Sequence, residues 1–73
     1  MDGLPAMLTP AQVAHVLGVH PKTVTRWARE GRLAPVMTPG GHRQYPTDGV
    51  LVFLCGTGFA EEAARTAVMN AVH

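Results

Sequence analysis

The feature that most restricts the fold of this chain is a repeated pattern in which proline begins a short helical segment and glycine ends it. At the first start, Thr9 is expected to cap a helix, Pro10 to occupy its first position, and Gln12 to complete a capping box. Gly18 is suited to end this helix in the left-handed conformation. Apolar residues recur between them at helical spacing, namely Val13, Val16 and Leu17. The pattern predicts a helix over residues 10–17.

A second segment follows within a few residues and is built in the same way. His20 precedes Pro21, and the segment runs to a stop at Gly31. We expect His20 to cap this helix. By the i, i+3, i+4 rule one face is apolar, with Val24, Trp27 and Ala28, which should pack in the core. Two short helices joined by a glycine-containing turn indicate a helix-turn-helix arrangement.

The next stretch predicts a small β-hairpin. Leu33 to Thr38 should form one strand and His42 to Tyr45 the other, around the turn Pro39-Gly40-Gly41. The two glycines permit positive φ angles at the tip and a close approach of the backbone to another surface. Pro35 implies an edge strand. The expected fold class is therefore mainly α with a small two-stranded β wing, a winged helix-turn-helix.

Two further helices are expected after the hairpin. Thr47 should cap a third helix whose core contacts come from Val50, Leu51, Phe53 and Leu54. After Gly56-Thr57-Gly58, a last helix over residues 59–72 carries an alanine-rich stripe that either covers the core or pairs with a second protomer. The expected organisation is a tail over residues 1–7, a winged helix-turn-helix domain over 8–55, and a C-terminal helix over 56–73.

Charge is distributed unevenly along the 73 residues. Five of the six Lys and Arg residues lie between positions 20 and 45, where the only acid is Glu30, so this segment carries a net charge of +4. The remainder of the chain carries −3. Such asymmetry favours one face directed to a polyanion and another directed to solvent.

Other classes of protein are disfavoured by the composition. A lone cysteine, Cys55, cannot form an internal disulfide, which suits a reducing, cytoplasmic setting. The N-terminus lacks the features of a secretory signal, and the longest apolar run is too short to span a bilayer. Neither a structural zinc spacing nor a catalytic constellation is evident among the residues considered, which include His15, His20, His42 and His73. We expect no enzyme activity, no metal and no cofactor.

The segment from Val19 to Leu33, together with Thr38 to Tyr45, closely resembles the MerR-type winged-helix family, in particular its small BldC-like and excisionase-like DNA-binding members. The resemblance covers roughly Leu8 to Leu54. It implies that the helix from Pro21 enters the major groove of DNA, while the wing from Gly40 to Arg43 lies against the adjacent backbone or minor groove. Gln44 stands where many relatives have a second basic residue, and the long effector-sensing region of larger relatives is missing.

These observations define a candidate set of DNA-binding residues. Arg26 and Lys22 can reach base edges or phosphates, and Arg43 fits a narrow anionic groove. For Tyr45 a place in the core is favoured over a DNA contact, and for Arg32 a phosphate contact and a pairing with Glu30 are evenly matched. The full candidate set is Lys22, Thr23, Thr25, Arg26, Arg29, Arg32, Gly40, Gly41, His42, Arg43 and Tyr45.

The leading hypothesis is a sequence-specific transcriptional regulator that binds double-stranded DNA in the cytoplasm, in association with the nucleoid. Its affinity would benefit from self-association on DNA, as a dimer or in tandem copies. An integrase or RNA polymerase is a candidate partner, and no membrane is expected. One alternative is an excisionase-type protein that bends DNA for a recombinase. Another is a protein-interaction adaptor that uses the alanine-rich stripe.

Overall fold

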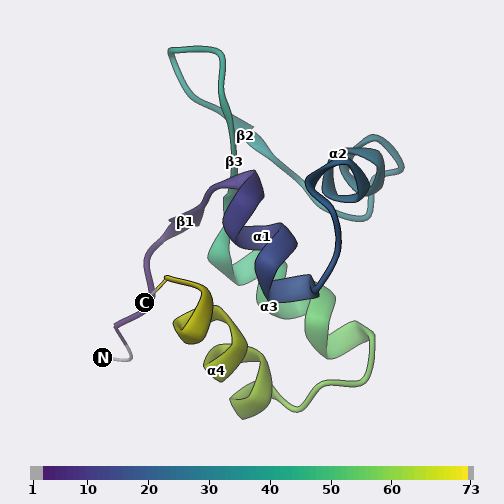
Figure 1. Ribbon diagram of the computed structural model, residues 1–73, viewed down its shortest axis with the longest axis vertical. Helices are drawn as coiled ribbons and strands as arrows, with labels where there is room; N and C mark the ends of the chain where they lie inside the picture. Colours follow the sequence, from purple (N-terminus) through teal and green to yellow (C-terminus); the bar gives the residue numbers. More distant parts are fainter. Residues whose placement is uncertain (1–2, 73) are drawn as a thin grey trace.

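Four helices and a small antiparallel sheet make up residues 3–72, the part of the chain that the computed structural model describes (Figure 1). The strands are β1 (Met7–Leu8), β2 (Val36–Met37) and β3 (Arg43–Pro46). The helices are α1 (Pro10–Leu17), α2 (Pro21–Arg29), α3 (Thr47–Gly56) and α4 (Glu61–Val72). This mainly helical architecture with a wing confirms the expected fold class.

The predicted boundaries of the first two helices are confirmed, because the capping residues act as expected. The Thr9 hydroxyl accepts a hydrogen bond from the Gln12 backbone N–H at 3.1 Å, and the Gln12 side chain accepts one from the Thr9 N–H at 2.9 Å. Gly18 ends α1 with φ +70°, and Gly31 follows the end of α2 with φ +81°. A positive φ is costly for other residues, so glycine defines both helix ends.

The sheet has three strands in the order β1-β3-β2, one more than the expected hairpin. The pairing of β2 with β3 is the predicted wing, although β2 is limited to two residues. The unexpected strand, β1, places Leu8 opposite Tyr45. Two residues are too few to show strand periodicity, so this pairing depends on a partner distant in sequence.

Thr47 does not have the predicted capping role. The N-cap of α3 is Pro46, and Thr47 is the buried first residue of the helix. Its hydroxyl donates to the Pro5 carbonyl at 2.6 Å, and its backbone N–H donates to the Ala6 carbonyl at 2.9 Å. Both acceptors belong to the N-terminal segment, which is far from Thr47 in sequence, so the residues around Thr47 do not indicate these bonds. The two hydrogen bonds hold the N-terminal segment against the start of α3.

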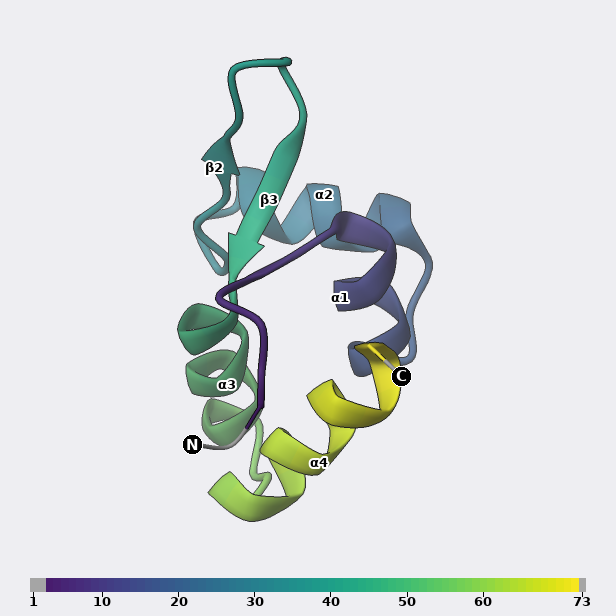
Figure 2. The same ribbon diagram turned by 90° about the vertical axis from the view of Figure 1, so that its left-hand side faces the viewer.

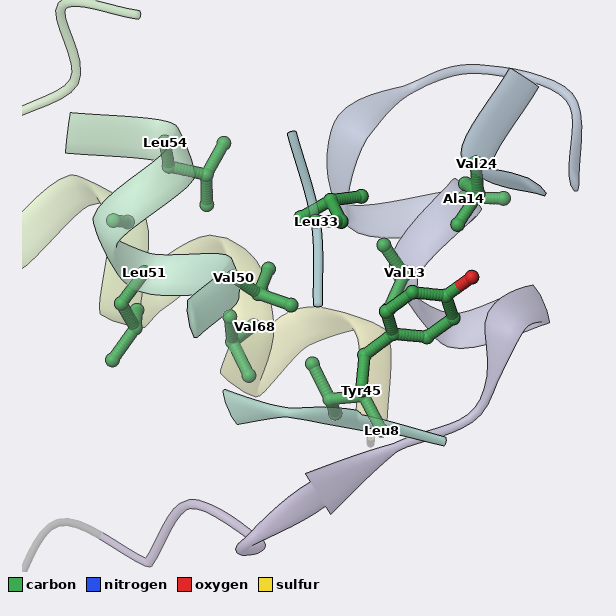
Figure 3. Close-up of a cluster of buried hydrophobic side chains, with 11 residues drawn as sticks. Leu8, Val13, Ala14, Val24, Leu33, Tyr45, Val50, Leu51, Leu54 and Val68 are labelled. Atoms are coloured by element: carbon green, nitrogen blue, oxygen red, sulfur yellow. The ribbon is translucent and has the colours of Figure 1, made fainter. Parts of the chain in front are cut away.

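The core lies between the helices and the central strand β3, as Figure 3 shows for its buried side chains. Trp27 and Phe53 are half-buried and pack against this core, as expected. Phe59, in the connection before α4, is 48% exposed. The largest fully buried side chains are Leu8, Val13, Val24, Tyr45, Val50 and Val68.

The last helix begins at Glu61, two residues later than expected, and packs against α1 and α3. Of its alanine-rich stripe, Ala64 and Val68 are fully buried, whereas Ala63 is exposed. Part of the stripe therefore covers the core. The division into tail, domain and C-terminal helix stays a prediction, as does pairing with a second protomer. Within residues 3–72, no helix has the length and apolar character to cross a membrane.

Candidate nucleic-acid interface

Helix α2 has one face anchored in the protein and another open to solvent. Val24 is fully buried, and the Trp27 ring lies against the Phe53 ring of α3 with a centroid separation of 5.3 Å. The exposed face is basic and forms a shallow hollow lined by Lys22, Thr25, Arg26 and Arg29. The arrangement joins four of the predicted site residues on one surface.

The start of α2 is held by local hydrogen bonds. The His20 Nδ1 atom accepts a hydrogen bond from the Lys22 backbone N–H at 3.1 Å, which confirms the predicted cap. The Thr25 hydroxyl donates to the Pro21 carbonyl at 3.4 Å. This hydroxyl still has an acceptor site for an external donor. Thr23 is half-buried on the first turn.

The wing turns tightly between Thr38 and His42. The His42 carbonyl accepts from the Thr38 backbone N–H at 2.8 Å and from its hydroxyl at 3.1 Å. Gly41 has φ +82°, whereas Gly40 does not have a positive φ. A Cβ on Gly40 would lie 3.4 Å from the His42 Cδ2 atom. Of the two glycines, only Gly41 adopts the positive φ angle that glycine tolerates better than other residues.

Arg43 lies where the wing meets the start of α1. Its side chain is half-buried, and it lines a hollow together with residues of both elements. The other lining residues are Thr9, Pro10, Thr38, His42 and Gln44. This hollow presents one guanidinium and no carboxylate among its lining residues, a combination that suits an anionic oxygen.

The wing projects from the body, with α2 beside its base (Figures 1 and 2). The basic face of α2 and the wing tip are thus separate parts of the surface, connected by residues 30–38. A ligand that engages both must therefore span the surface between them.

Two candidate residues are placed differently from the others. Tyr45 is 1% exposed, and its hydroxyl is buried without a hydrogen-bond partner among the described residues. The preference for the core is confirmed, and the proposed DNA contact of Tyr45 is wrong, because the ring occupies the space between β3 and α1. Arg32 pairs with Glu30, with 3.3 Å between Nε and Oε1. A phosphate contact by Arg32 stays a prediction.

The wing also exposes apolar side chains that the sequence reasoning missed. Met37 is 58% exposed and Val36 is 46% exposed. Met37 is directly opposite Arg43 in the sheet, so the two side chains lie on the same face. The sequence alone does not indicate that Met37 and Arg43 share a face, because this depends on the register of the strands. The turn and the third strand determine that register.

Within residues 3–72, no group of three or more His, Cys, Asp or Glu side chains could hold a metal ion. His73, one of the histidines considered, lies outside the described residues. The expectations of no metal, no cofactor and no enzyme activity stay predictions.

Comparison with known families agrees with this geometry. The profile of a family described as "Helix-turn-helix domain" matches residues 7–57, from β1 to just beyond α3. No curated protein matches the chain.

Proposed function

The chain belongs to this helix-turn-helix domain family, and from that premise we propose that it binds double-stranded DNA. Helix α2 enters the major groove, and the wing lies on the adjacent backbone or minor groove. An α-helix with its side chains is about 10–12 Å in diameter, which suits a major groove about 12 Å wide.

The observation that supports the proposal most strongly is that α2 has one buried apolar face and one exposed basic face. Burial of Val24 fixes which face is inward, so Lys22, Arg26 and Arg29 are all presented outward. The first turns of a recognition helix approach base edges, and arginine can bond two acceptors of guanine at once. Arg26 is therefore assigned to base recognition, and Lys22 and Arg29 to phosphates or base edges.

The wing supplies the second contact. Gly41 forms the turn without a side chain at the tip, and Arg43 lies half-buried behind it. A guanidinium in this position is attracted to the negative potential of a narrow minor groove. The proposed DNA-binding set is completed by Thr23, Thr25, Arg32, Gly40 and His42, and it no longer includes Tyr45.

In the cell, we assign the protein to the small MerR-like, BldC-like transcriptional regulators, acting at the nucleoid in the cytoplasm. One domain of this size neutralises few phosphates, so useful affinity favours two or more copies on DNA, as a dimer or in tandem. RNA polymerase is the candidate partner of such a regulator.

A second candidate is an excisionase-type protein that bends DNA and directs an integrase. The exposure of Val36 and Met37 beside Arg43 favours it, because apolar side chains at a groove often accompany bent DNA. A strong bend in permuted-fragment gels, with a neighbouring integrase gene, supports this role. Promoter binding without a bend supports the regulator.

The test is selection of bound duplexes from a random DNA library, followed by binding measurements at increasing salt. We expect one enriched motif and an affinity that falls steeply with salt. Arg26→Ala should weaken binding and relax the base preference at one position of the motif, and Arg43→Ala should reduce the salt slope by about 1, whereas Arg65→Ala on α4 should leave both unchanged. An affinity independent of salt, or equal slopes for Arg43→Ala and the unaltered chain, contradicts the mechanism.

A further inference from the structure

The described surface exposes large apolar side chains in three places, namely on the wing, on α3 and at Phe59 in the connection before α4. Val36 and Met37 lie on the wing beside Arg43, where the proposed DNA contact accounts for them. Val52 on α3 is 72% exposed, the highest value among the large apolar side chains of residues 3–72. The proposed DNA contact gives Val52 no role.

Val52 belongs to a hollow between α3 and the start of α4. Asp48, Val52 and Cys55 follow one another at helical spacing, so they share one face of α3. Phe53 projects about 100° further round the helix and packs on Trp27 of α2. The hollow is therefore on a different side of α3 from the contact with the DNA-binding helix. Its lining residues are Asp48, Leu51, Val52, Cys55 and Glu61.

The charge around this hollow is net negative. Asp48 and Glu61 are the ionisable acids that line it, and no Lys, Arg or His is among the lining residues. The nearest cation is Arg65, which pairs with Glu61 at 3.3 Å and lines the adjoining hollow with Asp48 and Leu51, so two acids face one cation here. An acidic rim repels the phosphate backbone, so DNA is not the occupant of this surface.

We propose that this hollow docks a segment of a second protein that carries one large apolar side chain flanked by Lys or Arg. The apolar side chain covers Val52 and Leu51, and the flanking cations face Asp48 and Glu61. Because the hollow and the exposed face of α2 are on different sides, the same molecule can hold this segment while bound to DNA. The inference does not depend on the DNA sequence that α2 recognises.

The experiment uses a phage-displayed library of random peptides and the full chain immobilised by one terminus. We expect enriched peptides to share an apolar residue next to Lys or Arg. A labelled synthetic copy of the most enriched peptide is then titrated with each variant. Val52→Lys should weaken its binding at least ten-fold, and Asp48→Asn should weaken it several-fold. Val36→Lys, which alters an exposed valine of the wing, should leave the binding unchanged.

Other outcomes overturn the proposal. These are a failure to enrich any motif, enrichment of acidic peptides, and binding that is equally strong to Val52→Lys. A change of sedimentation between the unaltered chain and Val52→Lys overturns it as well, because a second copy would then be the occupant. Thermal melting of Val52→Lys should match that of the unaltered chain, because the substituted side chain is exposed.

Discussion

The rings of Trp27 and Phe53 lie 5.3 Å apart, centroid to centroid, with their planes tilted by 35°. This contact joins the outward-facing helix α2 to α3, and the two residues lie 26 positions apart in sequence. It therefore positions the proposed DNA-binding face relative to the rest of the fold.

Removing either ring should destabilise the protein. Phe53→Ala and Trp27→Ala are each expected to lower the free energy of unfolding by about 3 kcal/mol, the low end for aromatic truncations, because both rings are half-buried. A double-mutant cycle by urea denaturation should give a coupling of about 1 kcal/mol. The cycle of Phe53→Ala with Thr9→Ala serves as the additive control. An equal coupling in both cycles would show that the ring contact has no special contribution.

Tyr45→Phe should stabilise the protein or leave its stability unchanged. The Tyr45 hydroxyl is buried and makes no hydrogen bond among the described residues, and an unsatisfied buried polar group costs about 1–3 kcal/mol. DNA affinity should not change, because the hydroxyl cannot reach a phosphate. Thermal denaturation and DNA titration check both points, and a clear loss of stability would show that the hydroxyl has a partner.

The two wing glycines should respond differently to alanine. Gly41→Ala places a Cβ on a residue with φ +82°, which costs about 1–2 kcal/mol and distorts the turn that carries Arg43. Gly40→Ala meets only the exposed His42 side chain, at 3.4 Å, which can move aside. Gly41→Ala should thus weaken DNA binding more than Gly40→Ala. Equal affinities would argue against a role for the turn.

Thr47→Val should loosen the N-terminal segment. The substitution keeps the shape of the side chain but removes the 2.6 Å hydrogen bond to the Pro5 carbonyl, at an expected cost of about 1 kcal/mol. Hydrogen exchange at the Leu8 amide should become faster. The matched control is Thr66→Val, since the Thr66 hydroxyl bonds only the Glu62 carbonyl on an exposed face of α4. If both variants lose equal stability, the bond to Pro5 is not important.

Glu30→Gln should strengthen DNA binding with little effect on stability. Arg32 and Glu30 form an exposed ion pair, and such pairs contribute little to folding. Loss of the carboxylate removes repulsion of phosphate and releases Arg32, so the salt slope should become steeper by up to about 1. DNA titration at several salt concentrations measures the slope. An unchanged slope would show that Arg32 makes no contact with a phosphate.

Local rules were sufficient wherever a residue's partner lies within a few positions in the chain. The capping box of Thr9 and Gln12, the helix end at Gly18 and the His20 cap all depend on backbone groups at most four residues away. The apolar spacing of Val24 and Trp27 likewise determined which face of α2 is outward, and hence most of the candidate site.

Tertiary structure decided the features whose partners are far apart in sequence. The pairing of Leu8 with Tyr45 and the bond from Thr47 to Pro5 join segments about 40 residues apart, so no local pattern indicates them. Burial of Tyr45 removed it from the candidate site because β3 directs its ring toward α1. The exposure of Met37 and Val52 was decided in the same way, since hydrophobicity alone does not determine which apolar side chains a core of this size can cover.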